Sequence, residues 1–208
     1  MTLLKALELL TLAEVNFKQI MNPIALAIES HQQAVESLKQ QLGEVEVCGQ
    51  LLLVSLKAGH KVLVCGNGGS AADAQHFAAE LTGRFETQRR ALPAIALTTD
   101  TSALTAIGND FGFDQIFSRQ VEALGNAGDC LVAISTSGHS KNVIQAVTMA
   151  KSQGLTCVGL LGRDGGALKA MCDVSVVIEH PQTARIQECH LLIEHIWCAM
   201  MDQAFSSN

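Results

Sequence analysis

Residues 61–84 read KVLVCGNGGSAADAQHFAAELTGR, and they combine the features of a strand, a turn and a helix. Its apolar start, 62–65, predicts a buried strand, the glycine-rich segment 66–69 interrupts that run, and 71–81 is rich in helix formers. A strand, a glycine turn and a helix start favour anion binding, because free backbone N–H groups point outward and the helix dipole adds positive charge. No Gly-Lys-Ser/Thr follows, and the glycines have the wrong spacing for a dinucleotide fingerprint.

The helix that follows this turn carries two further signals. Ser70 is a candidate N-cap, and Asp73 three residues later makes an imperfect capping box. His76 and Glu80 are four residues apart and therefore share one helix face. Such a pair suits one metal ion or a division of acid and base work, although a solvated surface pair has the same spacing. The nearby anion-binding turn favours a functional role.

Composition excludes several classes of protein. At 208 residues the chain fits a single domain, 1–208, and its 48% hydrophobic content is ample for a core. The net charge of −6 and the 4% of aromatic residues argue against nucleic-acid or anionic-membrane partners. A small anionic substrate stays compatible, since helix N-termini bind anions locally.

Cysteine usage and hydropathy indicate a cytoplasmic protein with no membrane segment. The seven cysteines are scattered and form no CxxC pair, so we expect reduced thiols. No apolar run reaches 18 residues, and Lys5, Glu8 and Glu14 interrupt the Leu-rich start, which argues against a signal peptide.

From residue 60 onward, strands and helices alternate. The predicted strands are 61–65, 93–98, 129–134, 156–161 and 174–179, and the predicted helices are 70–83, 102–108, 113–124, 141–153, 165–171 and 183–205. Strands that are apolar throughout suit a parallel sheet covered on both faces. The pattern predicts a doubly wound, flavodoxin-like α/β core over 60–208 with five parallel strands, whose ligands lie beyond the strands' carboxyl ends.

The first 59 residues lie outside this alternation and are predicted to be helical. Helices are expected over 2–20, 24–41 and 45–57, with Pro23 separating the first two. Their apolar stripe packs either on the chain's own core or on a partner subunit, and we favour a bundle of subunit arms.

Polar loops gather at the carboxyl ends of the predicted strands. Residues 67–70 follow the first strand, and the turn 108–112, which includes Asn109 and Asp110, follows the second. The third strand delivers 135–140, STSGHS, whose hydroxyls and glycine before a helix start predict a second anion cradle. No lysine or arginine is built into that segment. The loop 162–166 is either a ligand loop or a plain turn.

The last helix mixes polar and apolar residues, and spacing alone does not select its functional side chains. Gln187 and His195 lie about 12 Å apart along a straight helix. Glu194 and His190 are equally good candidates on that evidence.

The four segments CGNGGSAADAQHFAAELTGRF, GNDFGF, AISTSGHS and ARIQECH together resemble the phosphoheptose isomerases, members of the sugar isomerase (SIS) superfamily. The resemblance covers most of residues 16–205. It implies a five-stranded parallel sheet and a homotetramer assembled through N-terminal helices. It also implies conversion of D-sedoheptulose 7-phosphate to D-glycero-D-manno-heptose 7-phosphate, which begins bacterial heptose synthesis for lipopolysaccharide.

The resemblance also assigns site residues. Catalytic positions fall on Glu80 and His195, and zinc positions on His76, Glu80, Gln187 and His195. The substrate-binding positions are Asn67, Gly68, Gly69, Ser70, Glu80, Asn109, Asp110, Ser135, Thr136, Ser137, Ser140 and Gln187. The amide oxygen of Gln187 is a weak zinc ligand, so we expect modest affinity and a tuning or stabilising metal rather than an essential one.

A non-catalytic relative that associates with a replication initiator shares most of these motifs but lacks the catalytic Glu and the second His. The presence of Glu80 and His195 therefore favours the enzyme. A sugar-phosphate-sensing regulator and a hexose or amino-sugar phosphate isomerase are further alternatives. Two departures from the family pattern are His139, in place of Asn, and Ala184, where some members have Asp.

Overall fold

The computed structural model describes residues 22–206 and contains a five-stranded, all-parallel sheet, as the sequence predicts. The strands are β1 Val62–Cys65, β2 Ala94–Ala96, β3 Cys130–Ser135, β4 Thr156–Gly162 and β5 Val174–Ile178, in the order β2-β1-β3-β4-β5. β1 and β3 are buried along their whole length, which explains their continuous apolar sequence. The chain leaves this central pair in opposite directions, so the switch point of the fold lies between β1 and β3.

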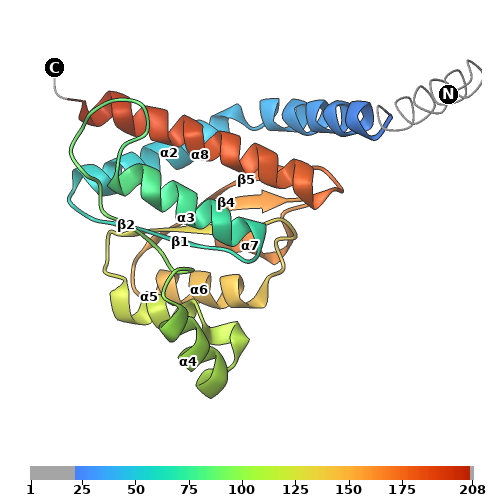
Figure 1. The fold of residues 1–208 in the computed structure, drawn as a ribbon. Coiled ribbons are helices and arrows are strands. Elements are labelled where there is room, and N and C mark those ends of the chain that lie inside the picture. Colours follow the sequence, from blue (N-terminus) through green and yellow to red (C-terminus); the bar gives the residue numbers. More distant parts are fainter. Residues whose placement is uncertain (1–21, 207–208) are drawn as a thin grey trace, which may run out of the picture.

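Helices cover both faces of the sheet (Figure 1). On one face lie α2 Leu42–Lys57, α3 Gly69–Thr82 and α8 Thr183–Phe205, whose apolar residues form one core cluster with the sheet. On the other face lie α4 Thr101–Phe111, the 3-10 turn η1 Phe113–Gln115, α5 Ser118–Leu124, α6 Lys141–Ser152 and α7 Gly166–Met171, which share the second cluster. Trp197 of α8 anchors the first cluster, and its indole N–H donates to the carbonyl of Val45 at 2.8 Å.

Upstream of the core, the described part of the chain is helical from 22 to 39 and again in α2. Figure 1 shows this first helix extending away from the sheet. It carries Ile24, Leu26 and Ile28 with about half of each side chain exposed. Pro23 lies within helical backbone at the start of the described residues, and the predicted helix 2–20 lies outside them.

Two predicted boundaries are wrong. The polar segment 108–112 is not a turn after a short helix, because α4 continues to Phe111 and ends at Gly112, whose φ of 88° only glycine adopts easily. The predicted helix 113–124 is divided into η1 and α5. At this division Ile116 and Phe117 are buried, and the Ser118 hydroxyl donates to the carbonyl of Gln115.

All seven cysteines are free. Six are buried, and burial raises the pKa of Cys48 and Cys157 to about 12. These thiols are therefore poor nucleophiles at neutral pH, in agreement with a packing role. Among residues 22–206, no helix is both long and apolar enough to cross a membrane.

Candidate active site

The β1–α3 loop begins one side of the switch point. Gly68, with φ 56°, is the residue before α3, and its carbonyl accepts from the N–H groups of Ala71 and Ala72. Ser70 therefore lies inside the first turn, where it is buried and makes no capping hydrogen bond. The predicted capping box of Ser70 with Asp73 is wrong. With no capping side chain, the first backbone N–H groups of α3 keep their anion-binding capacity.

Gln187 of α8 lies directly against the start of α3. A Cβ added at Gly69 would lie 2.3 Å from Nε2 of Gln187, so only glycine leaves room for this amide. The structure thus brings Gln187 to the anion-binding end of α3. The spacing along α8 alone did not identify it.

Further along the same two helices, His76 and His195 meet. Their Nε2 atoms are 2.8 Å apart, and Nε2 of His76 is 3.8 Å from Oε1 of Glu80. Phe85 stacks on the other side of the His195 ring, with centroids 5.2 Å apart and an interplanar angle of 25°. All three polar side chains are part exposed, and solvent reaches them. A carboxylate and two imidazoles, distant in sequence, therefore converge on one accessible point.

Parallel alignment of α3 and α8 produces this convergence. Gly69 contacts Gln187 near the start of both helices, and His76 contacts His195 seven and eight residues later. Figure 1 shows α3 and α8 together on one face of the sheet. The two helices therefore contact each other at several points along their length. α3 contributes Gly69, His76 and Glu80, and α8 contributes Gln187 and His195.

The β3–α6 loop forms the opposite side of the switch point. The hydroxyls of Ser135 and Ser140 are 3.0 Å apart, and Ser135 and Ser137 accept from the N–H groups of Gly138 and His139. The Ser140 side chain makes no capping bond to α6, so the first N–H groups of that helix can bind a ligand. No lysine or arginine lies within 135–140, but the exposed Lys141 follows directly as the first residue of α6.

The 162–166 loop packs under this cradle. A Cβ at Gly138 would lie 2.0 Å from the carbonyl oxygen of Gly165, and Leu168 donates its N–H to the carbonyl of Gly138. A Cβ at Gly162 would overlap the carbonyl oxygen of Thr136. Close backbone packing explains these glycines, and it favours the plain-turn interpretation of the loop.

The structure does not bring Asn109 and Asp110 to the point where His76, Glu80 and His195 meet. Both are exposed at the carboxyl end of α4, where Nδ2 of Asn109 donates to Asp110 at 2.7 Å. α4 covers the opposite face of the sheet from α3 and α8 (Figure 1). Within one subunit, therefore, these two residues are separate from His76, Glu80 and His195.

Buried carboxyl groups between α3 and α8 are a feature that the sequence analysis missed. Glu194 is fully buried with neither carboxylate oxygen hydrogen-bonded, and Oδ2 of Asp73 is also buried without a partner. Burial, and then the charge of Asp73, raises the pKa of Glu194 to about 9. Burial raises the pKa of Asp73 to about 6, against the influence of His76. His190 is buried as well, which lowers its pKa to about 4, and its Nε2 donates to the carbonyl of Leu161.

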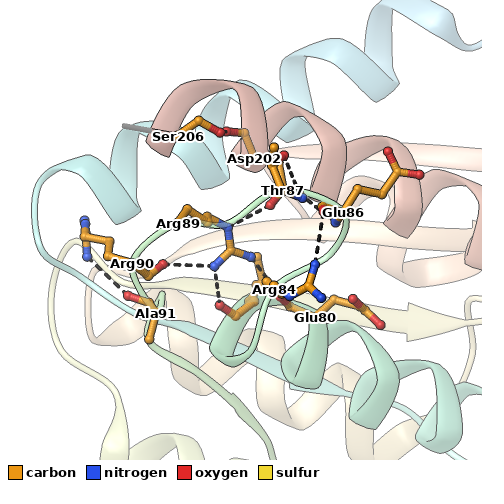
Figure 2. A network of polar contacts seen from close by, with 10 residues as sticks. Glu80, Arg84, Glu86, Thr87, Arg89, Arg90, Ala91, Asp202 and Ser206 are labelled. Carbon is orange, nitrogen blue, oxygen red and sulfur yellow. Dashed lines mark hydrogen bonds and ion pairs between the residues drawn. The ribbon is translucent and has the colours of Figure 1, made fainter. Parts of the chain in front are cut away.

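At the far end of the same helices, the 83–93 loop is tied to α8 through Asp202 (Figure 2). Asp202 accepts from the N–H groups of Glu86 and Thr87, from the Thr87 hydroxyl, and from Nε of Arg89 at 2.8 Å. The fully buried Arg89 guanidinium also donates to the carbonyls of Glu80 and Leu81, which are in the last turn of α3. This network fixes the end of the helix that carries Glu80 and holds Phe85 beside His195.

His76, Glu80 and His195 fit zinc by donor type, since imidazole nitrogen and carboxylate oxygen are common zinc ligands. Their spacing is that of a direct hydrogen bond: two nitrogens on one tetrahedral zinc lie about 3.3 Å apart, compared with 2.8 Å between these Nε2 atoms. Within residues 22–206, no three His, Cys, Asp or Glu side chains are already grouped as a metal site.

Comparison with known proteins identifies relatives that match most of the chain. A model of the SIS domain matches residues 28–162. The phosphoheptose isomerase of Campylobacter concisus is 57% identical over 86% of this chain and 94% of its own length, and that of Aliarcobacter butzleri is 54% identical over 85% and 94%. The structure of phosphoheptose isomerase from Neisseria gonorrhoeae superposes with a TM-score of 0.84 at 49% identity, covering 88% of this chain and 99% of that one.

Proposed function

The chain belongs to the phosphoheptose isomerase family, and from this premise we propose the reaction it catalyses and the residues that carry it out. The reaction is the aldose–ketose isomerisation of D-sedoheptulose 7-phosphate to D-glycero-D-manno-heptose 7-phosphate, the first step of bacterial heptose synthesis. The observation that carries the proposed site is the meeting of His76, Glu80 and His195 at one accessible point. A non-catalytic SIS protein has no need for that arrangement.

Isomerisation moves one proton between adjacent carbons and another between their oxygens. Glu80 acts as the carbon base, because its carboxylate is part exposed and lies 3.8 Å from Nε2 of His76, which in turn contacts His195. His195 moves protons at the oxygens, and donors near it stabilise charge on the enediolate oxygen. The 2.8 Å spacing of the two Nε2 atoms requires one ring to donate and the other to accept, so a proton is already shared there.

The phosphate is held at the switch point, at the starts of α3 and α6. Ser135, Ser137 and Ser140 supply hydroxyls, and the starts of α3 and α6 supply backbone N–H groups and partial positive charge. Gln187 lies against Gly69 at the phosphate end of α3, where it contacts the ligand. Asn109 and Asp110 lie on the opposite face of the sheet from Glu80 and His195, so they contact the reacting end of a substrate only from another subunit.

His76, Glu80, Gln187 and His195 would hold zinc, which polarises the sugar carbonyl and stabilises the enediolate when bound. Support for this assignment comes from the donor types of the four residues and from the convergence of His76, Glu80 and His195. We expect weak binding, because one of the four ligands is an amide.

The test is a coupled assay of sedoheptulose 7-phosphate isomerisation with purified protein, with and without a chelator. Glu80→Gln should lower kcat by about a hundredfold or more with little change in KM, because it keeps the shape and loses the base. Gln75→Glu, one turn earlier on the exposed surface of α3, is a matched control and should leave kcat unchanged. A Glu80→Gln enzyme with near-normal kcat would rule out Glu80 as the base.

We further propose that residues 1–59 assemble a homotetramer in the cytoplasm. Support comes from exposed apolar side chains on the 22–39 helix and on α2, namely Ile24, Leu26, Ile28, Leu42, Val47 and Val54. Such a surface is unfavourable in water unless a partner covers it. Leu26→Asp with Ile28→Asp should reduce the mass measured by light scattering, and an unchanged tetramer would place the interface elsewhere.

A further inference from the structure

A pair of asparagine side chains connects the two loops at the switch point. Nδ2 of Asn67 donates to Oδ1 of Asn142 at 2.9 Å, and Nδ2 of Asn142 donates to Oδ1 of Asn67 at 2.8 Å. Asn67 is in the β1–α3 loop, whereas Asn142 is in the first turn of α6, after the β3–α6 loop. The two amides thus form a reciprocal pair, and this pair bridges the two predicted anion cradles.

Asn142 is the fixed member of this pair. It is 2% exposed, and its Oδ1 also accepts from the backbone N–H of Val143 at 3.0 Å. Since a backbone N–H only donates, the atom facing it must be the oxygen, and this determines which way the amide of Asn142 points. Asn67 is the part-exposed member, and its amide orientation follows from that of its partner.

The pairing leaves Asn67 with one amide N–H and one oxygen lone pair directed away from Asn142. The free N–H can donate to a phosphate or hydroxyl oxygen of a ligand at the switch point. A rotation of the Asn67 amide by half a turn would exchange donor and acceptor and break both bonds to Asn142. Such a rotation is therefore costly while Asn142 is in place.

We propose that Asn142 is a positioning residue for sugar-phosphate binding. It acts through Asn67, whose amide it holds in the orientation that donates to the ligand, and it ties the β1–α3 loop to the start of α6. This inference rests on the proposed role of Asn67 as a substrate contact. No local sequence pattern distinguishes Asn142 from a surface asparagine in the first turn of a helix.

The test is a double-mutant cycle of wild type, Asn67→Ala, Asn142→Ala and the double variant, with kcat and KM measured for the isomerisation. Each single substitution should raise KM by about tenfold with a smaller change in kcat, as expected for one lost hydrogen bond to the ligand. The double variant should be no worse than Asn67→Ala, within about twofold, because Asn142 then has nothing left to position. Effects that multiply would overturn the inference.

Asn142→Asp guards against a folding defect. It is isosteric and can still accept from Nδ2 of Asn67, but it cannot donate to Oδ1 of Asn67, so KM should rise as much as in Asn142→Ala. Gln120→Ala is the matched control, since this buried amide donates to the carbonyls of Leu97 and Ile116 away from the switch point. It should lower Tm and leave KM unchanged.

The outcomes separate the two proposals. If Asn67→Ala leaves both kcat and KM at wild-type values, Asn67 is not a substrate contact, and both its proposed role and this inference fail. If Asn67→Ala raises KM but Asn142→Asp does not, only the inference fails. If the effects of Asn67→Ala and Asn142→Ala on KM multiply in the double variant, again only the inference about Asn142 fails.

Discussion

Two buried carboxyl groups along the α3–α8 interface differ in their hydrogen bonding. Asp202, near the carboxyl ends, accepts four hydrogen bonds and pairs with the buried Arg89 (Figure 2). Glu194, about two turns earlier on the same helix, is equally buried and has no hydrogen-bond partner. Buried charge stabilises a fold only where its partners are complete. The far end therefore holds the two helices together, while the end beside the candidate site carries unsatisfied groups.

The pKa values of these two carboxyl groups are shifted in opposite directions, as their hydrogen bonding predicts. Burial by itself would raise the pKa of Asp202, but hydrogen bonds from Thr87, Glu86 and Arg89 outweigh it and lower that pKa. Glu194 has no such donors, and its pKa is raised to about 9. The same substitution at the two positions should consequently have opposite effects on stability.

Asp202→Leu is expected to have the largest effect. It leaves the Arg89 guanidinium buried without its carboxylate and frees the 83–93 loop, so the free energy of unfolding should fall by about 3–5 kcal/mol. Urea unfolding at fixed protein concentration measures it, because assembly contributes to apparent stability. A loss below about 1 kcal/mol would show that the network in Figure 2 contributes little.

Glu194→Leu should change stability in the opposite direction. Removing a buried carboxyl that has no hydrogen-bond partner should raise the free energy of unfolding at pH 8 by about 1–3 kcal/mol. The measurement uses the same urea titration, with Asp202→Leu as the matched carboxyl-to-leucine change. Destabilisation by both variants would mean that Glu194 has favourable contacts beyond hydrogen bonds.

The advantage of Glu194→Leu over wild type should also grow with pH. The folded carboxyl keeps its proton up to about pH 9, whereas the unfolded one releases it near the ordinary value of 4.5. The wild-type protein therefore has its full stability from protonated Glu194 below pH 4.5. As pH rises toward 9 this contribution to the free energy of unfolding is lost, by at most about 1.4 kcal/mol per pH unit, because the unfolded carboxyl releases its proton and the folded one does not. Unfolding at pH 5, 6.5 and 8 with a chelator present tests this, and a constant difference would contradict it.

Phe85→Leu should have the smallest effect. The substitution removes the ring that stacks on His195 but keeps an apolar side chain, so stability should change by about 1 kcal/mol. The kcat should fall several-fold, because the imidazole gains freedom to rotate. Phe111→Leu, whose ring is exposed on α4 and lies under Arg119, is the control and should leave kcat unchanged.

The sheet was largely predictable from sequence, because the strands are short apolar runs and the central ones, β1 and β3, are buried along their whole length. The ends of the helices were less predictable. The polar run before Gly112 has the composition of a turn, yet α4 continues through Asn109 and Asp110. The convergence of His76 with His195 required knowing that α3 and α8 run parallel, and no local pattern contains that. Neither did any local pattern connect Arg89 to Asp202, which are 113 residues apart in the chain.

The position of α8 in the chain has a consequence for biosynthesis. Gln187, His195 and Asp202 all belong to α8, which follows every strand of the sheet. A polypeptide emerging from the ribosome therefore presents all five strands before it can supply either α8 histidine or the acceptor for Arg89. Until α8 is synthesised, the apolar surface that packs against Trp197 would be exposed in the nascent chain. Binding of a chaperone to the nascent chain is therefore expected to be strongest during this stage of synthesis.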